Sequence, residues 1–411
     1  MAVDPRLRLG PLAFAFGVIL LALAGGAAAQ TSPPAANVAV QIPTAYIKAE
    51  RDRPLPISRV NVVPADAGLR GAELAVKDNN TTGRFTKQSF SLKRYDLPKS
   101  GDAAALIAQI VTDGIGLVMV DAGAGRLIEL ADAARGKPML LFNLDARDTS
   151  LREEDCRANI VHVAPSRAEL ADALAQFLVL KKWTRWLLVS GANQDDKAFA
   201  DAIRRSAKKF GARIVAEKLY AVTDASARTD SGHAQVQQQI AVFTQGVAEH
   251  DIIVVADESE IFGPYMAYRS WSPRLVAGTS GLVPMSWHPA HEQWGATQLQ
   301  NRFAVLAGRM MTPLDFHGWL AARAVGEAAT RSNSGAFTAH RDYLLGPEFG
   351  VAAFKGQKLS IRPWNLQMRQ PIAVGTTELP ISWSPQAGFL HQRSELDTLG
   401  IDEPENKCKL Q

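Results

Sequence analysis

Apolar, strand-like runs alternate with amphipathic helical segments along this chain, and this alternation constrains the fold more than any other feature. In the first half we predict, in order, a strand at 45–49, a helix at 69–79, a strand at 89–95, a helix at 103–113, a strand at 116–120, a helix at 125–134 and a strand at 139–142. Crossovers between parallel strands must pass over a face of the sheet. The pattern therefore indicates a parallel sheet that is covered on both faces.

The alternation starts again after Ser166. This serine stands at the N-cap position of a predicted helix, and Glu169 follows three residues later, which is the pattern of a capping box. The second series comprises helices at 167–180, 197–210 and 234–246 and strands at 185–189, 213–219, 251–256 and 274–277. A further helix is predicted later in the chain, at 316–330. We therefore predict an α/β fold of two doubly wound, Rossmann-like lobes joined by a hinge.

Each lobe is expected to draw on separate parts of the chain. We assign residues 30–165 and 278–340 to lobe 1, residues 166–277 and 341–375 to lobe 2, and residues 376–411 to a C-terminal tail that wraps over the surface. Short strands are predicted within 349–370, with 358–363 and 364–369 forming an antiparallel hairpin.

The N-terminus has the pattern of a signal peptide. Arg6 and Arg8 precede an apolar run of 14 residues, shorter than the roughly 20 residues that span a bilayer. Small side chains up to Ala29 favour cleavage before Gln30, and no cysteine at this point can take a lipid. We expect a soluble periplasmic protein after cleavage near Ala29. The alternative is an N-terminal helix that is buried in the fold.

The sequence contains two cysteines, Cys156 and Cys408. In an oxidising compartment they are a candidate disulfide that would tie the C-terminal tail to the middle of the chain. Two unrelated thiols are the alternative, because a sequence does not supply the Cα separation that bridging requires.

Several classes of function lack their sequence signals. Lysines and arginines are scattered, so we expect no nucleic-acid partner, and the eight histidines show no zinc-type spacing, so we expect no metal or cofactor. The segment Gly278–Gly281 has the wrong spacing for a nucleophile elbow, and Val120–Gly125 lacks the third glycine of a dinucleotide fingerprint. The latter turn still directs backbone N–H groups to a helix start, which suits a polar or anionic ligand group. We expect a binding protein and no enzyme.

The segment Gly71–Val76, followed by Lys-Asp-Asn-Asn, resembles the helix that opens the first lobe of branched-chain amino-acid-type (type I) periplasmic binding proteins. Ala164–Ser166 resembles their crossover into the second lobe, Ala200–Ala212 its first helix and turn, and Phe349–Phe354 the late edge strands. The resemblance implies the solute-binding component of an ABC-type uptake system. Its partners would be a small-molecule solute and an inner-membrane ABC permease.

A narrower resemblance involves Val63–Ala72 and Asp78–Gly83. These segments look like the subgroup of such proteins that is associated with PQQ-dependent alcohol oxidation. The resemblance implies a role beside a periplasmic quinoprotein dehydrogenase, without implying that this chain binds the quinone. A periplasmic sensor or accessory interaction protein for such a dehydrogenase is therefore the alternative function.

The resemblance also places ligand contacts, and this chain departs from the family at several of them. The serine that holds the ligand carboxylate in amino-acid binders falls on Asp121–Ala124, a Ser/Ala/Thr stretch on Asn143–Ala146, and a Tyr-Gly pair on Asp195-Asp196. The candidate ligand contacts are Asp121, Ala122, Gly123, Asn143, Leu144, Asp145, Asp195, Asp257, Glu258 and Thr279. Because carboxylates replace hydroxyls, we expect a cationic, polyhydroxylated or neutral solute and no amino acid. The alternative is that these acids are ordinary surface-loop residues.

Overall fold

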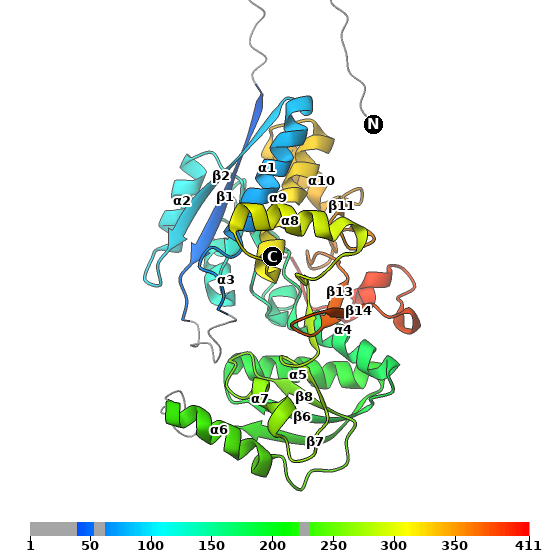
Figure 1. The fold of residues 1–411 in the computed structure, drawn as a ribbon. Coiled ribbons are helices and arrows are strands. Elements are labelled where there is room, and N and C mark those ends of the chain that lie inside the picture. Colours follow the sequence, from blue (N-terminus) through cyan, green and yellow to red (C-terminus); the bar gives the residue numbers. More distant parts are fainter. Residues whose placement is uncertain (1–38, 53–61, 222–229, 411) are drawn as a thin grey trace, which may run out of the picture. The chain divides into compact units, whose positions relative to one another are not determined.

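The computed structural model describes residues 39–52, 62–221 and 230–410. The expected signal peptide and its cleavage site lie outside the described residues. Within the described part of the chain, parallel sheets with helices on their faces form the main architecture, as the alternation predicts (Figure 1).

The first sheet is parallel, with strand order β2-β1-β3-β4-β5. Its strands are β1 (Val40–Ala49), β2 (Gln88–Leu97), β3 (Leu117–Asp121), β4 (Leu140–Asn143) and β5 (Ile160–His162), and the helices between them are α1 (Leu69–Thr86), α2 (Ala103–Thr112) and α3 (Ala124–Ala133). The strands are longer or shorter than predicted by a few residues, and α1 continues seven residues beyond its expected end.

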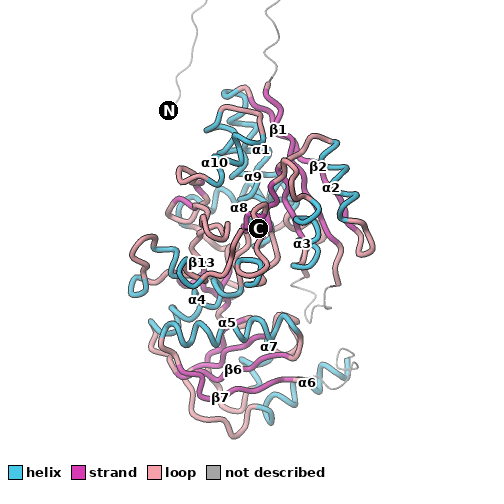
Figure 2. The backbone as a smooth tube through the Cα atoms, turned by 180° about the vertical axis from the view of Figure 1, so that it is seen from behind, coloured by secondary structure: helices cyan, strands magenta, loops and turns pink. Residues whose placement is uncertain are grey.

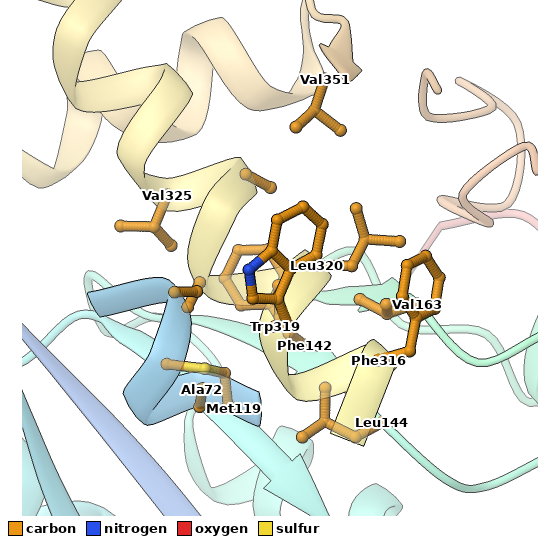
Figure 3. Close-up of a cluster of buried hydrophobic side chains, with 14 of the residues drawn as sticks. Ala72, Met119, Phe142, Leu144, Val163, Phe316, Trp319, Leu320, Val325 and Val351 are labelled. Carbon is orange, nitrogen blue, oxygen red and sulfur yellow. The ribbon is translucent and has the colours of Figure 1, made fainter. Parts of the chain in front are cut away.

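Strand residues of the first sheet alternate between two hydrophobic cores. Met119 and Phe142 belong to the core beneath α1 and α9 (Pro313–Ser332), whereas Val118 and Leu141 belong to the core beneath α2 and α3. Figure 3 shows Met119 and Phe142 close to Trp319 of α9. Figure 2 shows α1 and α9 on one side of the sheet and α2 and α3 on the other. Both faces of this sheet are thus covered, which explains its nearly continuous apolar strands.

Close packing of α1 against α9 depends on glycine. A Cβ on Gly71 would lie 1.7 Å from the carbonyl oxygen of Asp315, and a Cβ on Gly318 would lie 2.1 Å from the carbonyl oxygen of Gly68. The glycines near the start of α1 therefore let two helix backbones approach each other.

The second sheet is also parallel and has the order β7-β6-β8-β9. Its elements are α4 (Arg167–Leu180), β6 (Arg185–Gly191), α5 (Gln194–Phe210), β7 (Arg213–Tyr220), α6 (Asp230–Phe243), β8 (Ile252–Ala256), α7 (Gly263–Arg269) and β9 (Leu275–Gly278). The predicted capping box at the start of α4 is confirmed: the Ser166 hydroxyl accepts from the Glu169 N–H at 3.2 Å, and the Glu169 carboxylate accepts from the Ser166 N–H at 2.8 Å.

The last third of the chain contains elements that the sequence pattern did not predict. They are α8 (Ala296–Ala307), α10 (Phe337–Leu345), and an antiparallel sheet of β10 (Val283–Met285), β13 (Ile372–Gly375) and β14 (Pro380–Ser384). The expected pairing of 358–363 with 364–369 is present as an antiparallel bridge between Ile361 and Met368, while β11 (Val351–Ala352) pairs with β12 (Lys358–Leu359).

The boundaries of the lobes stay a prediction, and the packing favours moving one of them. Leu344, Leu359 and Met368 lie in the core of the first sheet, although residues 341–375 were assigned to lobe 2. Ile372 and Val374 lie in the core of the second sheet. Packing therefore favours placing 341–368 with lobe 1.

The C-terminal segment is tied to the middle of the chain. Cys156 and Cys408, the candidate pair of the sequence, form a disulfide with their Cα atoms 5.6 Å apart. Strand β14 also places part of the expected tail in the antiparallel sheet.

Candidate functional site

The strand order of each parallel sheet locates its switch point. In the first sheet the order changes direction between β1 and β3, and in the second between β6 and β8. Open α/β sheets bind ligands outside the carboxyl ends of their strands at such points. Residues that follow these strands line a cleft of about 550 Å³. The cleft is therefore the candidate site.

Six of the ten predicted contacts line this cleft. They are Gly123, Asp145, Asp195, Asp257, Glu258 and Thr279. The other four, Asp121, Ala122, Asn143 and Leu144, are buried and do not line it.

Ala122 and Leu144 continue the alternation of their strands. Ala122 lies in the same core as Val120, and Leu144 lies in the same core as Phe142. Their side chains therefore do not line the cleft, because the period of the strand directs them into the cores, and their role as ligand contacts stays a prediction.

Asn143 shapes the turn after β4. Its side chain accepts from the N–H of Ala146 at 2.9 Å and donates to the carbonyl of Ala146 at 2.8 Å. Its amide also lies 3.0 Å from Nδ1 of His162 on β5. The Asn143 side chain thus orders the turn that contains Asp145 and Ala146, which line the cleft.

Asp121 and Asp145 both contact Arg51, which follows β1. The Arg51 guanidinium lies 2.8 Å from Oδ1 of Asp121 and also forms an ion pair with Asp145. Tyr46 contacts Asp121 at 3.4 Å, and burial, together with the charge of Asp121, raises the pKa of Tyr46 well above its ordinary value. The hydroxyl of Tyr46 therefore stays protonated.

Arg167, the first residue of α4, gathers three carboxylates of the cleft. Its Nη2 lies 2.7 Å from Glu258 and 2.7 Å from Asp195, and its Nη1 lies 3.3 Å from Asp148. Burial acts to lower the pKa of Arg167, but Glu258 and the other carboxylates raise it above its ordinary value. The guanidinium is therefore a permanent cation in the wall of the cleft.

Asp257 and Thr279 mainly hold the loops of the second sheet. The Asp257 carboxylate accepts from the N–H groups of Ile261, Phe262 and Gly263 at 3.0, 2.8 and 2.6 Å. The Thr279 hydroxyl accepts from the Asp257 N–H at 3.0 Å. Both residues line the cleft, yet their hydrogen bonds order the start of α7 and the end of β9.

Several of the acids that the sequence predicts at the cleft are paired with arginines. Among the residues that the structure describes, seven carboxylates and three guanidinium groups line the cleft. Arg51 and Arg167 pair with several of these acids, as given above. Sequence reasoning missed these arginines, although Arg51 follows a strand and Arg167 directly follows the N-cap serine.

Arg147 and Glu260 differ from the paired groups. Both are exposed and line the cleft, and in the described part of the chain neither side chain has a recorded hydrogen bond or ion pair. Among the described residues Asp195 pairs with Arg167 alone, and it keeps 66% of its side chain exposed. Together with Asp52, which also lines the cleft, pairs with Lys99 and keeps 93% of its side chain exposed, these groups are the charges most accessible to a solute.

The described ranges contain no cluster of three or more His, Cys, Asp or Glu side chains that could hold a metal ion. No helix within these ranges is both long and apolar enough to cross a membrane.

The fold and the cleft define a binding protein built from doubly wound parallel sheets. The profile of the family described as "Periplasmic binding protein" matches residues 64–345. The chain belongs to this family. No curated protein matches the chain significantly.

Solved structures share the fold at low sequence identity. A branched-chain amino acid ABC transporter periplasmic ligand-binding protein from Burkholderia xenovorans is 15% identical, with 90% of this chain and 99% of that chain covered and a TM-score of 0.66. An R. palustris solute-binding protein in complex with benzoate is 11% identical (90% and 100% covered, TM-score 0.60). A substrate-binding protein from Desulfitobacterium hafniense in complex with Leu is 15% identical (84% and 99% covered, TM-score 0.58).

Proposed function

We propose that this chain is the periplasmic solute-binding subunit of an ABC-type uptake system. The observation that carries the proposal is the cleft of about 550 Å³, which residues after the strands of both parallel sheets line. The lobes, each formed around one of these sheets, close on the solute about the hinge, and an inner-membrane permease recognises the closed form. The protein carries out no covalent chemistry.

Two features that favour export support this proposal. The Cys156–Cys408 disulfide suits an oxidising compartment such as the periplasm, and the N-terminal pattern predicts a signal peptide. The structural likeness to proteins that hold leucine or benzoate supports a small organic solute.

The solute class follows from the accessible charges. Asp195 and Glu260 offer carboxylates to an ammonium or hydroxyl group, whereas Arg147 offers a single guanidinium to an acceptor. Carboxylates outnumber guanidinium groups in the cleft, so a solute with a cationic end is favoured over a simple carboxylate. We therefore propose an amine-bearing solute, with any carboxylate of that solute directed to Arg147.

Isothermal titration of the mature chain tests this proposal with putrescine, L-arginine, L-leucine, benzoate and glycerol. An amine is expected to bind. Asp195→Asn is expected to lower the affinity for that amine about tenfold or more, which corresponds to loss of a charged hydrogen bond. The matched control is Asp201→Asn on the same helix, whose side chain is 74% exposed and pairs with Arg204. Binding of benzoate alone would overturn the solute class, and no binding at millimolar concentrations would overturn the function.

The alternative link to a quinoprotein dehydrogenase rests on the two segments that resemble that subgroup. Val63–Ala72 and Asp78–Gly83 lead into and build α1, where Gly71 meets the backbone of Asp315 and Asn79 donates to the carbonyl of Ala322 on α9 at 2.8 Å. Gly71 and Asn79 thus serve helix packing, and neither contact favours an accessory role.

A further inference from the structure

Residues 395–408, here called the strap, contact the helices that cover the second sheet. The Gly400 N–H donates to the Asp172 carboxylate on α4 at 2.9 Å, and Lys209 on α5 donates to the Thr398 carbonyl at 2.7 Å. Leu399 lies in the core of the second sheet. The middle of the strap is therefore fixed to the second lobe.

The strap also contacts parts of the chain that belong with the first sheet. Asp397 accepts from Arg362 at 2.8 Å and from Arg369 at 2.7 Å. These arginines flank Gln367, which bridges to His162 of β5. The hairpin that holds Asp397 is therefore attached to the edge of the first sheet.

The far end of the strap returns to the first lobe. Asn406 donates to the carbonyl of Arg152 at 2.9 Å, and Cys408 is bonded to Cys156 in the loop before β5. Along its length the strap thus contacts the first lobe, then the second, then the first again.

Arg362 joins the strap to the start of α4. Its side chain is 2% exposed and donates to the carbonyls of Leu396 and Leu399 at 3.0 and 2.6 Å. The same guanidinium lies 3.4 Å from Glu169, the capping-box residue of α4. Movement of α4 relative to the hairpin would have to disturb this buried cation.

A cavity of about 380 Å³ lies between the hairpin and the tail. It is lined by Trp364 and Arg369 on one side and by His391–Ser394, Asp397 and Asp402–Pro404 on the other. Here the tail is not packed tightly against the hairpin. The strap is held by the ion pairs of Asp397, by its contacts with α4 and α5, by the buried side chains of Leu396 and Leu399, and by the disulfide.

We propose that the strap is a tether across the hinge, which limits how far the two lobes separate. The inference rests on the hinge closure of the proposed function. Reduction of Cys156–Cys408, or loss of the Asp397 ion pairs, releases one attachment to the first lobe and lets the lobes open further.

Small-angle X-ray scattering of the mature chain without solute tests this inference. The samples are the oxidised protein, the same protein after reduction, Cys156→Ser/Cys408→Ser and Asp397→Asn. The matched control is Glu403→Gln, which removes an exposed pair with Arg393 within the tail itself. Circular dichroism establishes that each sample is folded.

The radius of gyration is expected to rise in the reduced protein and in both tether variants and to stay unchanged in Glu403→Gln. Should Asp397→Asn fail to fold, the reduced protein and the double serine variant decide the outcome. Unchanged scattering from these folded proteins would overturn the tether. Because no solute is present, that result leaves solute binding standing, and failure of all solutes to bind would leave the tether standing.

Discussion

The guanidinium of Arg167 donates hydrogen bonds to the carboxylate of Glu258 through two nitrogens. Its Nε lies 3.1 Å from both carboxylate oxygens, and its Nη2 lies 2.7 Å from Oε2. The first turn of α4 is thereby joined to the loop after β8. Because Asp195 and Asp148 contact the same guanidinium, one buried cation organises the acidic part of the cleft.

Replacing Arg167 is expected to destabilise the fold. Arg167→Gln leaves Glu258 and Asp195 beside each other without their cation, and removal of one partner of a buried pair costs about 3–5 kcal/mol. Since Asp195 is largely exposed, we expect the lower end of that range in urea unfolding at pH 7. Arg204→Gln, which removes an exposed arginine, should cost less than about 1 kcal/mol. Equal losses of unfolding free energy in Arg167→Gln and Arg204→Gln would contradict this role of Arg167.

His317 is expected to make folding sensitive to acid. Its Nδ1 lies 2.6 Å from the carbonyl of Leu144 and its Nε2 2.7 Å from the hydroxyl of Ser286, and burial lowers its pKa to about 3. In the unfolded chain the pKa is about 6.5, so between these values the unfolded state binds more protons. The stability contributed by neutral His317 is complete above about pH 6.5 and is lost as the pH falls toward 3.

Urea unfolding between pH 4 and pH 7 measures this dependence. His317→Asn is expected to flatten the rise of unfolding free energy with pH, by an amount of the order of 2–4 kcal/mol over the window. His391→Asn, in the partly exposed tail pair with Asp402, is the control. A slope that is the same in His317→Asn and in the wild type would refute the assignment.

Gly71→Ala is expected to separate α1 from α9. The added Cβ would lie 1.7 Å from the backbone oxygen of Asp315, and such overpacking costs about 1–3 kcal/mol. Gly125→Ala, in α3, meets nothing within 4 Å and should stabilise by about 0.5–1 kcal/mol through helix propensity. Thermal unfolding of the two variants compares them, and a neutral Gly71→Ala would show that the helices are less closely packed.

The repeated alternation predicted both parallel sheets, because apolar strands buried on both faces and amphipathic helices leave a periodic signal. The segment from Trp287 to Phe303 has no such period, and the helix α8, which begins in this segment at Ala296 and ends at Ala307, was missed. Its residues Leu299 and Phe303 pack against the core of the first sheet, a tertiary contact that local pattern does not contain.

The position of the site in the fold was predictable from the sequence. The balance of charges that line it was less predictable. Parallel strands end at one edge, so Asp145, Asp195 and Glu258 were expected near one another, and all of them line the cleft. Their partners Arg51 and Arg167 come from segments far apart in sequence, and only the fold brings them together. For Ala122 and Leu144 the strand period could have indicated burial, since each lies two residues beyond a core residue of its strand.

A crystal structure of the mature chain, grown with the amine that binds most tightly in titration, tests the central claim most directly. We expect density for one solute molecule in the cleft, with its ammonium within about 3.2 Å of Asp195 or Glu260. Density for the solute elsewhere on the protein, with the cleft filled only by water, would contradict the account.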